Sequence, residues 1–256
     1  MKEKRFLPTN DLLFKKMLGD DYVAIGFINT LFRASVIEIV HVVPYDVVQL
    51  RRNYADKKLS RTEVDFICGS SANEKFIVEL QVLKEENFDM RALYYLCTKF
   101  CDGYSKEGNK YKGLKPVRMM CLTGFTIFSN TNDSFHKYAM KDMKGRYLFN
   151  KPTFELGVFE YCKENVPDNL KQIAEFLRSG KVELNYPSFL KRAAEIVRLE
   201  NLDEKEREAM QMYETLEEKM EEAKEFGKKE GIKLVKELIS KGYTFEQAAE
   251  LALQSE

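Results

Sequence analysis

Apolar residues recur at helical spacing in the first part of the chain. Between Asn10 and Phe32 they fall three or four residues apart, which predicts helix, and the polar run Gly19-Asp20-Asp21 predicts a break within it. Thr9 or Asn10 can cap the start, because a side-chain oxygen there accepts a hydrogen bond from a backbone N–H that the helix leaves unsatisfied. The β-branched stretch Val36–Val43 predicts a strand.

Two later segments alternate between apolar and polar residues with a period of two. The first sets Val64, Phe66 and Cys68 against Arg61, Glu63 and Asp65, and the second sets Phe76, Val78, Leu80 and Val82 against Lys75, Ile77, Glu79 and Gln81. Such alternation is typical of strands, since successive side chains point to opposite faces. The turn-forming run Gly69–Asn73 between them predicts an antiparallel hairpin, whose polar, non-core face carries Asp65, Glu79 and Gln81.

The remaining pattern mixes strands and helices and ends in helices. We expect a helix over Glu85–Tyr104, strands over Pro116–Phe128 and Phe154–Tyr161 around an irregular stretch rich in Lys, Asp and Asn, and helices over Leu170–Leu177 and Pro187–Leu199. Gly180 can end the first of these helices, and Thr244 with Gln247 forms a capping-box pattern. These elements predict an α/β fold with a mixed central sheet flanked by helices, a core over residues 1–165 and an α-helical C-terminal region over residues 166–256.

The tail from Leu202 carries an apolar stripe at alternating four- and three-residue steps: Ala209, Tyr213, Leu216, Met220 and Ala223. An amphipathic helix must bury such a stripe. It can pack on its own core, or it can pair with the same helix of a second chain. We favour the second arrangement, a homodimer, because a closed twofold is the commonest oligomer symmetry.

The composition is that of a globular protein. Of the 256 residues, 44% are hydrophobic and 32% are charged. The longest apolar stretches, Val36–Val43 and Met119–Phe128, fall short of the roughly 20 residues that span a bilayer. The first residues, Met1-Lys-Glu-Lys-Arg-Phe, lack the long apolar segment of a secretory signal. The sequence therefore predicts a cytoplasmic protein.

Cysteine and histidine usage argues against two kinds of site. The five cysteines are irregularly spaced, and Cys97 and Cys101 have no second pair or nearby histidine to complete a zinc site. We expect buried free thiols in a reducing compartment. With His41 and His136 as the only histidines, a histidine-based metal site and a Ser-His-Asp triad are both disfavoured.

A formal charge of zero conceals an asymmetry along the chain. Residues 201–256 hold 15 acidic and 9 basic side chains, a net charge of −6, and the whole chain holds 41 of each, so residues 1–200 carry +6. A basic body is compatible with a polyanionic ligand and does not require one.

The hairpin carries the candidate chemistry. Two carboxylates on adjacent strands form a hard-oxygen site of the kind that Mg²⁺ prefers, with water and substrate phosphate as further ligands. The alternative is that a half-exposed hairpin simply carries charged residues on its solvent face, and periodicity alone favours that alternative.

Longer patterns resemble a known nuclease group. The run Ser60-Arg-Thr-Glu-Val-Asp65, followed by Phe76-Ile-Val-Glu79-Leu-Gln81, resembles the core of the PD-(D/E)XK nuclease superfamily. More narrowly it resembles the Rpn family of recombination-promoting nucleases, which are also labelled transposases. The likeness extends to the first-helix run Pro8–Lys16, to Arg91–Tyr95 and to Tyr111–Val117, and covers about residues 5–165.

The resemblance implies a set of roles. Asp65 and Glu79 would bind Mg²⁺ or Mn²⁺, the backbone carbonyl of Leu80 would supply a third oxygen, and Gln81 would stand where most of the superfamily has lysine. An amide orients water but does not supply positive charge. Lys75 shares the strand face at roughly 13 Å, too far to replace that lysine. The implied activity is metal-dependent cleavage of double-stranded DNA with little sequence specificity, linked to recombination, transposition or phage defence.

Several assignments stay open at the level of sequence. Asp11 matches an accessory acid of the superfamily, or it complements the helix dipole. Arg61 contacts a phosphate or pairs with Glu63. At most one of Tyr94 and Tyr95 can line a DNA groove, because neighbouring helical residues point different ways. A non-catalytic DNA-binding or oligomeric interaction protein with the same fold is the rival function, and an RNA or nucleotide phosphoesterase is a third.

Overall fold

A computed structural model describes residues 7–41, 66–70, 74–82, 84, 87–102, 104, 111–147 and 153–210, with a few tail positions at 233, 234, 236, 237, 244 and 247. The chain divides into two compact units, one ending at Glu206 and one beginning at Arg207. In the described part no helix is both long and apolar enough to span a membrane.

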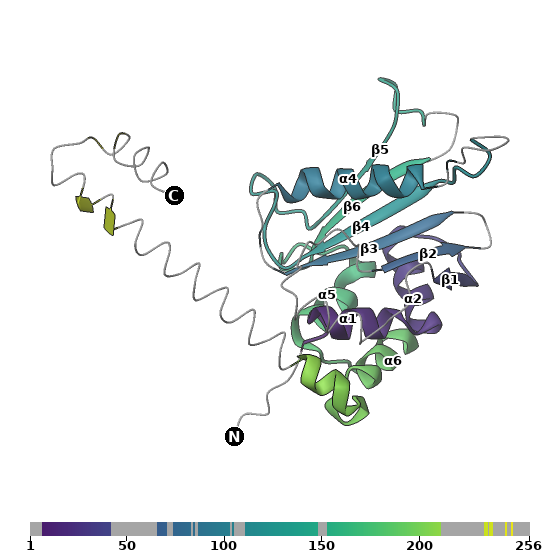
Figure 1. Cartoon of the computed structure of the whole chain (residues 1–256), viewed down its shortest axis with the longest axis vertical. Coiled ribbons are helices and arrows are strands. Elements are labelled where there is room, and N and C mark those ends of the chain that lie inside the picture. Colours follow the sequence, from purple (N-terminus) through teal and green to yellow (C-terminus); the bar gives the residue numbers. More distant parts are fainter. Residues whose placement is uncertain are drawn as a thin grey trace. The chain divides into compact units, whose positions relative to one another are not determined.

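A six-stranded mixed sheet forms the centre of the first unit (Figure 1). Its spatial order is β1-β2-β3-β4-β6-β5, from β1 (Ile39–His41), β2 (Phe66–Ser70), β3 (Lys75–Gln81), β4 (Val117–Thr123), β6 (Phe154–Glu160) and β5 (Phe135–Ala139). The strands β3, β4 and β6 run parallel, whereas β1, β2 and β5 pair antiparallel with their neighbours. The expected α/β fold with a mixed sheet is confirmed.

Helices cover both faces of this sheet (Figure 1). In the part of the chain that the structure describes, α4 (Phe88–Cys101) lies on one face, and on the other lie α1 (Asp11–Leu18), α2 (Asp21–Phe32), α5 (Lys171–Ser179) and α6 (Ser188–Ile196). A short 3₁₀ turn, η2 (Asp168–Leu170), leads into α5, and another, η3 (Leu199–Asn201), follows α6. Parallel strands need helices on both faces because their side chains are apolar on both sides.

The first helices form as the apolar spacing predicts. The Asn10 side chain accepts hydrogen bonds from the backbone N–H groups of Leu12 and Leu13 and so caps α1. Asp20 caps α2 in the same way through Val23, which places the predicted break between the two helices.

Arg118 of β4 fixes the end of α2 against the sheet. Its guanidinium donates to the carbonyl oxygen of Phe32 at 2.6 Å, lies 5.3 and 5.4 Å from the ring centroids of Phe32 and Phe76, and pairs with Glu155 at 3.1 Å. A buried cation is stable only with such partners. The face of the sheet that α2 covers is therefore closed by apolar packing and one paired charge.

α4 runs antiparallel to β3 on the opposite face. Near the start of α4, Arg91 donates a hydrogen bond to Gln81 at the end of β3, and near its end the carbonyl of Lys99 accepts from Lys75 Nζ at 2.9 Å. Between these contacts lies an apolar core of Ile67, Ile77, Tyr95, Leu96, Val117, Met119 and other side chains. α4 starts at Phe88, later than expected, because Asn87 has a left-handed backbone (φ 56°) that cannot continue a helix upstream.

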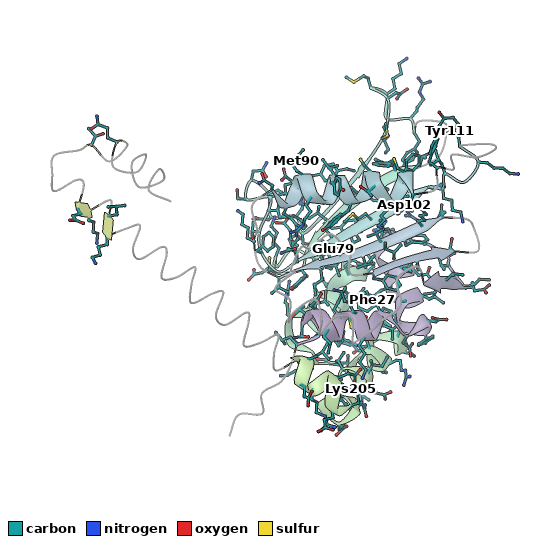
Figure 2. All side chains as sticks on the ribbon, viewed as in Figure 1. Phe27, Glu79, Met90, Asp102, Tyr111 and Lys205 are labelled. Atoms are coloured by element: carbon teal, nitrogen blue, oxygen red, sulfur yellow. The ribbon has the colours of Figure 1, made fainter. Side chains whose placement is uncertain are left out.

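The outer side of α4 exposes mostly apolar and sulfur-containing side chains, together with Asp89. Met90, Leu93 and Tyr94 are exposed, as are Cys97 and Cys101. Met90 lies on this outer side in Figure 2. Tyr95, in contrast, is buried in the core under α4, so the two neighbouring tyrosines do point different ways.

The strand β5 falls in the stretch that the sequence pattern leaves irregular. Its five residues, Phe-His-Lys-Tyr-Ala, pair antiparallel with β6 at the edge of the sheet and are only partly buried. An edge strand of this kind lacks a clean apolar face, which explains why alternation did not reveal it.

The expected division between residues 165 and 166 stays a prediction, and the helices α5 and α6 lie in the first unit, which ends at Glu206. Their apolar faces explain this, since Phe189 of α6 packs edge-on against Phe27 of α2 at 5.6 Å. Gly180 ends α5 in the left-handed conformation (φ 66°), as the sequence predicts. Lys16 of α1 pairs with Glu206 at 2.6 Å at the end of this unit.

Thr244 and Gln247 form the expected capping box in the tail. The Thr244 N–H donates to Gln247 Oε1 at 3.1 Å, and the Gln247 N–H donates to Thr244 Oγ1 at 3.3 Å. Ala209 of the heptad stripe is buried, whereas Tyr213, Leu216, Met220 and Ala223 lie outside the described residues.

Gly26 of α2 lies directly against the Phe189 side chain of α6. A Cβ there would lie 2.2 Å from Phe189 Cγ and 2.6 Å from Phe189 Cβ. We expect Gly26→Ala to lower the unfolding free energy by about 1–3 kcal/mol through overpacking, against a helix-propensity gain of at most about 1 kcal/mol. Thermal unfolding followed by circular dichroism measures this as a fall in Tm of several degrees.

Gly69→Ala is the matched control, because its Cβ would meet only Glu74 O at 3.9 Å. A Gly26→Ala protein as stable as this control would contradict the close packing of α2 on α6.

Candidate active site

The ends of the three parallel strands bring polar side chains to one edge of the sheet. Gln81 of β3 is in register with Thr123 of β4, which is in register with Glu160 of β6. Residues paired in register point to the same face, so all three side chains lie on the α4 side. One row back, Glu79 is in register with Cys121 and Val158.

Glu79, labelled in Figure 2, lies on the α4 side of the sheet and is buried there. Only 7% of its surface is exposed, and Gln81 is 8% exposed. The hypothesis of a solvent-exposed hairpin face is therefore wrong for these two residues. A buried carboxylate costs several kcal/mol unless hydrogen bonds or a cation compensate it. Glu79 therefore places a buried carboxyl group next to the edge where the parallel strands end.

Gln81 interacts with the first turn of α4. Its Oε1 accepts a hydrogen bond from Arg91 Nη2. The Arg91 guanidinium also lies 5.5 Å from the ring centroid of Phe88, and that ring packs edge-on against Phe125 at 6.1 Å. Arg91 and Gln81 are ten residues apart with a turn between them, and no periodicity could have paired them.

Of the other candidate residues around the hairpin, the structure describes Leu80 but not Asp65 or Arg61. Leu80 lies between Glu79 and Gln81 in β3, with its side chain on the opposite face. Asp65 and Arg61 lie outside the described residues. Phe66, which follows Asp65, pairs with Val78, the neighbour of Glu79, as the predicted hairpin requires.

Asp11 lies in the first turn of α1, where its carboxylate pairs with Lys15 at 2.9 Å. This placement matches the helix-dipole role that the sequence allowed. An accessory catalytic role for Asp11 stays a prediction.

Lys75 does not reach the strand ends. Its Nζ is bound to the Lys99 carbonyl at the far end of α4, and burial lowers the pKa of this lysine. The expectation that Lys75 is too far along β3 to stand in for a lysine at position 81 is consistent with this contact.

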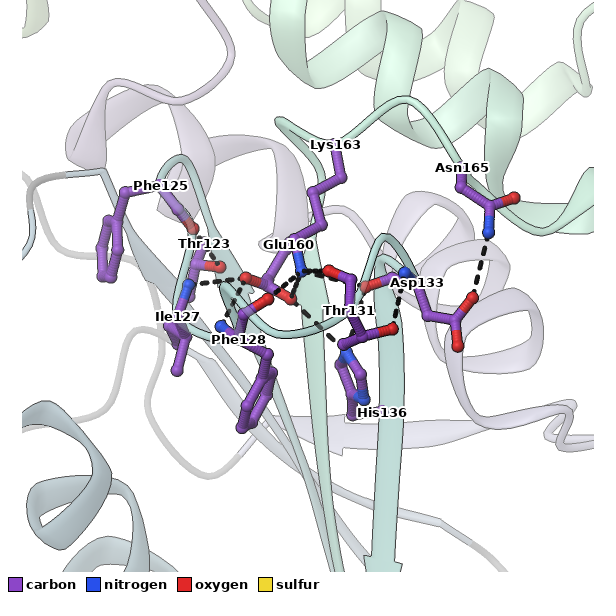
Figure 3. A network of polar contacts seen from close by, with 10 residues as sticks. All are labelled: Thr123, Phe125, Ile127, Phe128, Thr131, Asp133, His136, Glu160, Lys163 and Asn165. Carbon is purple, nitrogen blue, oxygen red and sulfur yellow. Dashed lines mark hydrogen bonds and ion pairs between the residues drawn. The ribbon is translucent and has the colours of Figure 1, made fainter.

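A buried ion pair fixes the loops that follow β4 and β6 (Figure 3). Glu160, which is fully buried, accepts hydrogen bonds from the N–H groups of Ile127 at 2.5 Å and Phe128 at 3.1 Å and pairs with Lys163 at 2.7 Å. Lys163 Nζ donates in turn to the carbonyl oxygens of Phe128, Thr131 and Asp133. His136 Nε2 lies 3.5 Å from the same carboxylate.

Sequence analysis missed this network. The available signal was an acid, Glu160, at the end of an apolar strand and on the same side as Val158. The network stabilises a loop next to the candidate site. Gly124, at the start of the loop that follows β4, donates its N–H to the carbonyl of Gln81 at 3.0 Å.

The cysteines form no metal site in the described structure. Cys68 and Cys121 are buried, and burial raises the pKa of Cys68 to about 12. Cys97, Cys101 and Cys162 are free and exposed, so the expectation of buried thiols is wrong for these three. Among the residues that the structure describes, no three His, Cys, Asp or Glu side chains gather closely enough to hold a metal ion.

A family model described as PD-(D/E)XK nuclease family transposase matches residues 8–230. The chain belongs to this family. Its mixed sheet, with Glu79 and Gln81 on a central strand, agrees with the fold of PD-(D/E)XK nucleases, which generally use divalent metal ions. Membership indicates a nuclease-type activity. Neither the curated proteins nor the solved structures contain a match to the chain.

Breaking the Glu160–Lys163 pair should destabilise this PD-(D/E)XK protein strongly. Lys163→Met leaves a buried carboxylate without its cation and three carbonyl oxygens without their shared donor. We expect a loss of about 3–5 kcal/mol in unfolding free energy, measured by urea denaturation.

Lys171→Met provides a matched control. Lys171 pairs with Asp168 at the same 2.7 Å and the same spacing of three residues, but both side chains are exposed. An exposed pair contributes at most about 1 kcal/mol. Equal losses in the two variants would show that burial does not govern the Glu160 pair.

Proposed function

We propose that this chain is a divalent-metal-dependent endonuclease that hydrolyses phosphodiester bonds of double-stranded DNA in the cytoplasm. The observation that carries the proposal is the buried carboxylate of Glu79, on the same strand face as Gln81 and at the edge where the parallel strands end. The family match supports the nuclease class. The net charge of +6 on residues 1–200 suits a polyanionic substrate.

The residues fit a hard cation. Glu79 offers a carboxylate oxygen from β3, where Cys121 is its partner in register and Ile77 precedes it on the same strand face. Within the described residues, no cluster of thiols and imidazoles offers a competing metal site. Glu79, Asp65 and the backbone carbonyl of Leu80 would hold Mg²⁺ or Mn²⁺, which prefer oxygen ligands. When bound, the ion would polarise the scissile phosphate and lower the pKa of a water molecule.

A residue of the protein would orient the attacking water. A carbonyl oxygen has two lone pairs, so Gln81 Oε1 can accept from Arg91 and also from the attacking water. The water oxygen bonds to phosphorus and gives a proton to solvent, the bond from phosphorus to the leaving sugar oxygen breaks, and that oxygen takes up a proton from solvent. Asp11 would act as an accessory acid only if its pairing with Lys15 opens.

The chemistry fits a role in recombination, transposition or phage defence, which all need breaks in duplex DNA. The rival is a DNA-binding or oligomeric interaction protein with the same fold but no cleavage. An RNA or nucleotide phosphoesterase would share the site and differ in its preferred substrate.

Glu79→Gln and Asp65→Ala should each lower metal-dependent plasmid nicking by at least about 100-fold, since the loss of a ligand removes several kcal/mol of transition-state stabilisation. Calorimetric titration with Mn²⁺ and no DNA should show weakened metal binding in both variants. Glu79→Gln keeps the volume of the buried side chain, so circular dichroism should report an unchanged fold.

Glu164→Ala, at an exposed acid, is the control and should cut like the parent. A parent protein that binds duplex DNA but never nicks it with Mg²⁺ or Mn²⁺ would favour the non-catalytic rival. Faster cleavage of RNA or free nucleotides would favour the phosphoesterase.

We extend the proposal to a homodimer formed through the tail stripe. A chain that ends at Met210 keeps the Lys16–Glu206 pair and loses Tyr213, Leu216, Met220 and Ala223. We expect light scattering to report a dimer for the full chain and a monomer for the shortened one, which should lose double-strand cutting before nicking.

A full-length variant separates pairing from truncation. Leu216→Glu places a charge within the stripe and should give a monomer, whereas Glu217→Lys, off the stripe, should leave the dimer intact. A parent chain that stays monomeric at tens of micromolar would assign the stripe to packing within one chain.

A further inference from the structure

Hydrolysis at this site builds negative charge on the phosphate, and Gln81 cannot offset it. An amide offers hydrogen bonds but no net charge, and a charge-stabilising group is usually a large contributor to catalysis. Lys75, on the same strand, is held by the Lys99 carbonyl at the other end of α4. A positive charge must therefore come from an element other than β3.

Arg91 of α4 brings a guanidinium to the end of β3. Its Nη2 donates to Gln81 Oε1, so the charged group lies within one hydrogen bond of the side chain at the lysine position. The backbone of Arg91 is part of the first turn of α4, where its N–H donates to Asn87 O at 3.0 Å. The backbone of Arg91 is thus fixed by the helix.

The guanidinium is also packed in place. Its carbon lies 5.5 Å from the Phe88 ring centroid, and Phe88 is itself buried against Phe125. A cation over an aromatic face is attracted to the ring. A guanidinium is a planar group with five N–H donors, whose shape matches a flat, two-oxygen acceptor such as a phosphate.

Glu79 and Gln81 are two residues apart on one strand face, which separates their Cα atoms by roughly 7 Å. A phosphate placed beside Glu79 would therefore lie within reach of a group bound at Gln81. We propose that Arg91 is a catalytic residue of this protein: it supplies from α4 the positive charge that lysine supplies from the strand elsewhere in the superfamily. The proposal rests on the endonuclease function proposed above.

Arginine changes the behaviour of such a site in one definite way. A lysine buried at a strand end loses its proton more easily, because burial lowers its pKa. A guanidinium remains charged throughout the working range of pH. The site would keep its cation under alkaline conditions where a lysine-based site starts to lose it.

The alternative is that Arg91 only holds the Gln81 side chain in position. Two substitutions separate these roles. Arg91→Gln keeps a hydrogen-bond donor near Gln81 but removes the charge, and Gln81→Lys places a charge on the strand itself. In the single variant Gln81→Lys, the new ammonium lies beside Arg91, so the two cations repel each other.

The test measures single-turnover nicking of supercoiled plasmid with Mn²⁺ for the parent, Arg91→Gln, Gln81→Lys and the double variant Arg91→Gln/Gln81→Lys. We expect Arg91→Gln to lower the rate at saturating enzyme by about 100-fold or more, with Mn²⁺ binding by calorimetry unchanged. The double variant should recover at least about 10-fold over Arg91→Gln and should lose activity as pH rises, since its cation titrates. Arg198→Gln, at an exposed arginine paired with Glu200, is the control and should cut like the parent.

The outcomes are distinguishable. Full activity in Arg91→Gln overturns the inference and leaves the endonuclease function standing. An inactive double variant assigns Arg91 to holding Gln81 and likewise overturns the charge role. A parent that does not cut under any divalent metal condition refutes the proposed function, and the inference falls with it. If Arg91→Gln fails to fold by circular dichroism, Arg91→Lys gives the same test, because a retained charge predicts partial activity.

Discussion

Three parallel strands cannot leave either of their faces in water, and this requirement shapes the first unit. The face of β3, β4 and β6 that carries Ile77, Val117 and Met119 has to be covered, and α4 is the only helix that covers it in the described structure. The helix that closes the core therefore also lies over Glu79 and Gln81. Packing and the candidate chemistry use the same contact between β3 and α4, tied at its two ends by Gln81–Arg91 and Lys75–Lys99.

The two buried acids on this face, Glu79 and Glu160, have different surroundings. Glu160 is neutralised by Lys163, and its other oxygen receives two backbone N–H groups, so its charge is committed to holding loops. Glu79 lies one row further into the sheet, beside Cys121 and near a strand end with an arginine. The two carboxylates thus share burial and strand direction but differ in their surroundings, since Glu160 accepts from loop N–H groups and Glu79 lies on a strand in register with Cys121.

Much of the fold follows from local pattern. The apolar spacing and caps near Asn10 and Asp20 gave α1 and α2, and period-two alternation gave the hairpin of β2 and β3. The burial of Glu79 did not follow, because alternation tells which residues share a face and not whether a later helix covers that face. Strand β5 was missed since an edge strand mixes His, Lys and Tyr with few apolar positions.

The candidate site also has parts that the sequence predicts and parts that it does not. The strand positions of Glu79 and Gln81 could be assigned from the motif and its resemblance to a nuclease family. The pairs Gln81–Arg91 and Glu160–Lys163 could not, because each depends on where a turn returns the chain. Tertiary contacts of this kind have no signature in spacing.

The exposed side of α4 has a consequence for how a nucleic acid could approach. Its exposed side chains are mostly uncharged, and its two basic residues are engaged near the helix ends, Arg91 with Gln81 and Lys99 with Asp102. Backbone phosphates bind where lysine and arginine release their condensed counterions. If the proposed function holds, a duplex would therefore find more positive charge at the Arg91 end of α4, beside the end of β3, than along the middle of the helix.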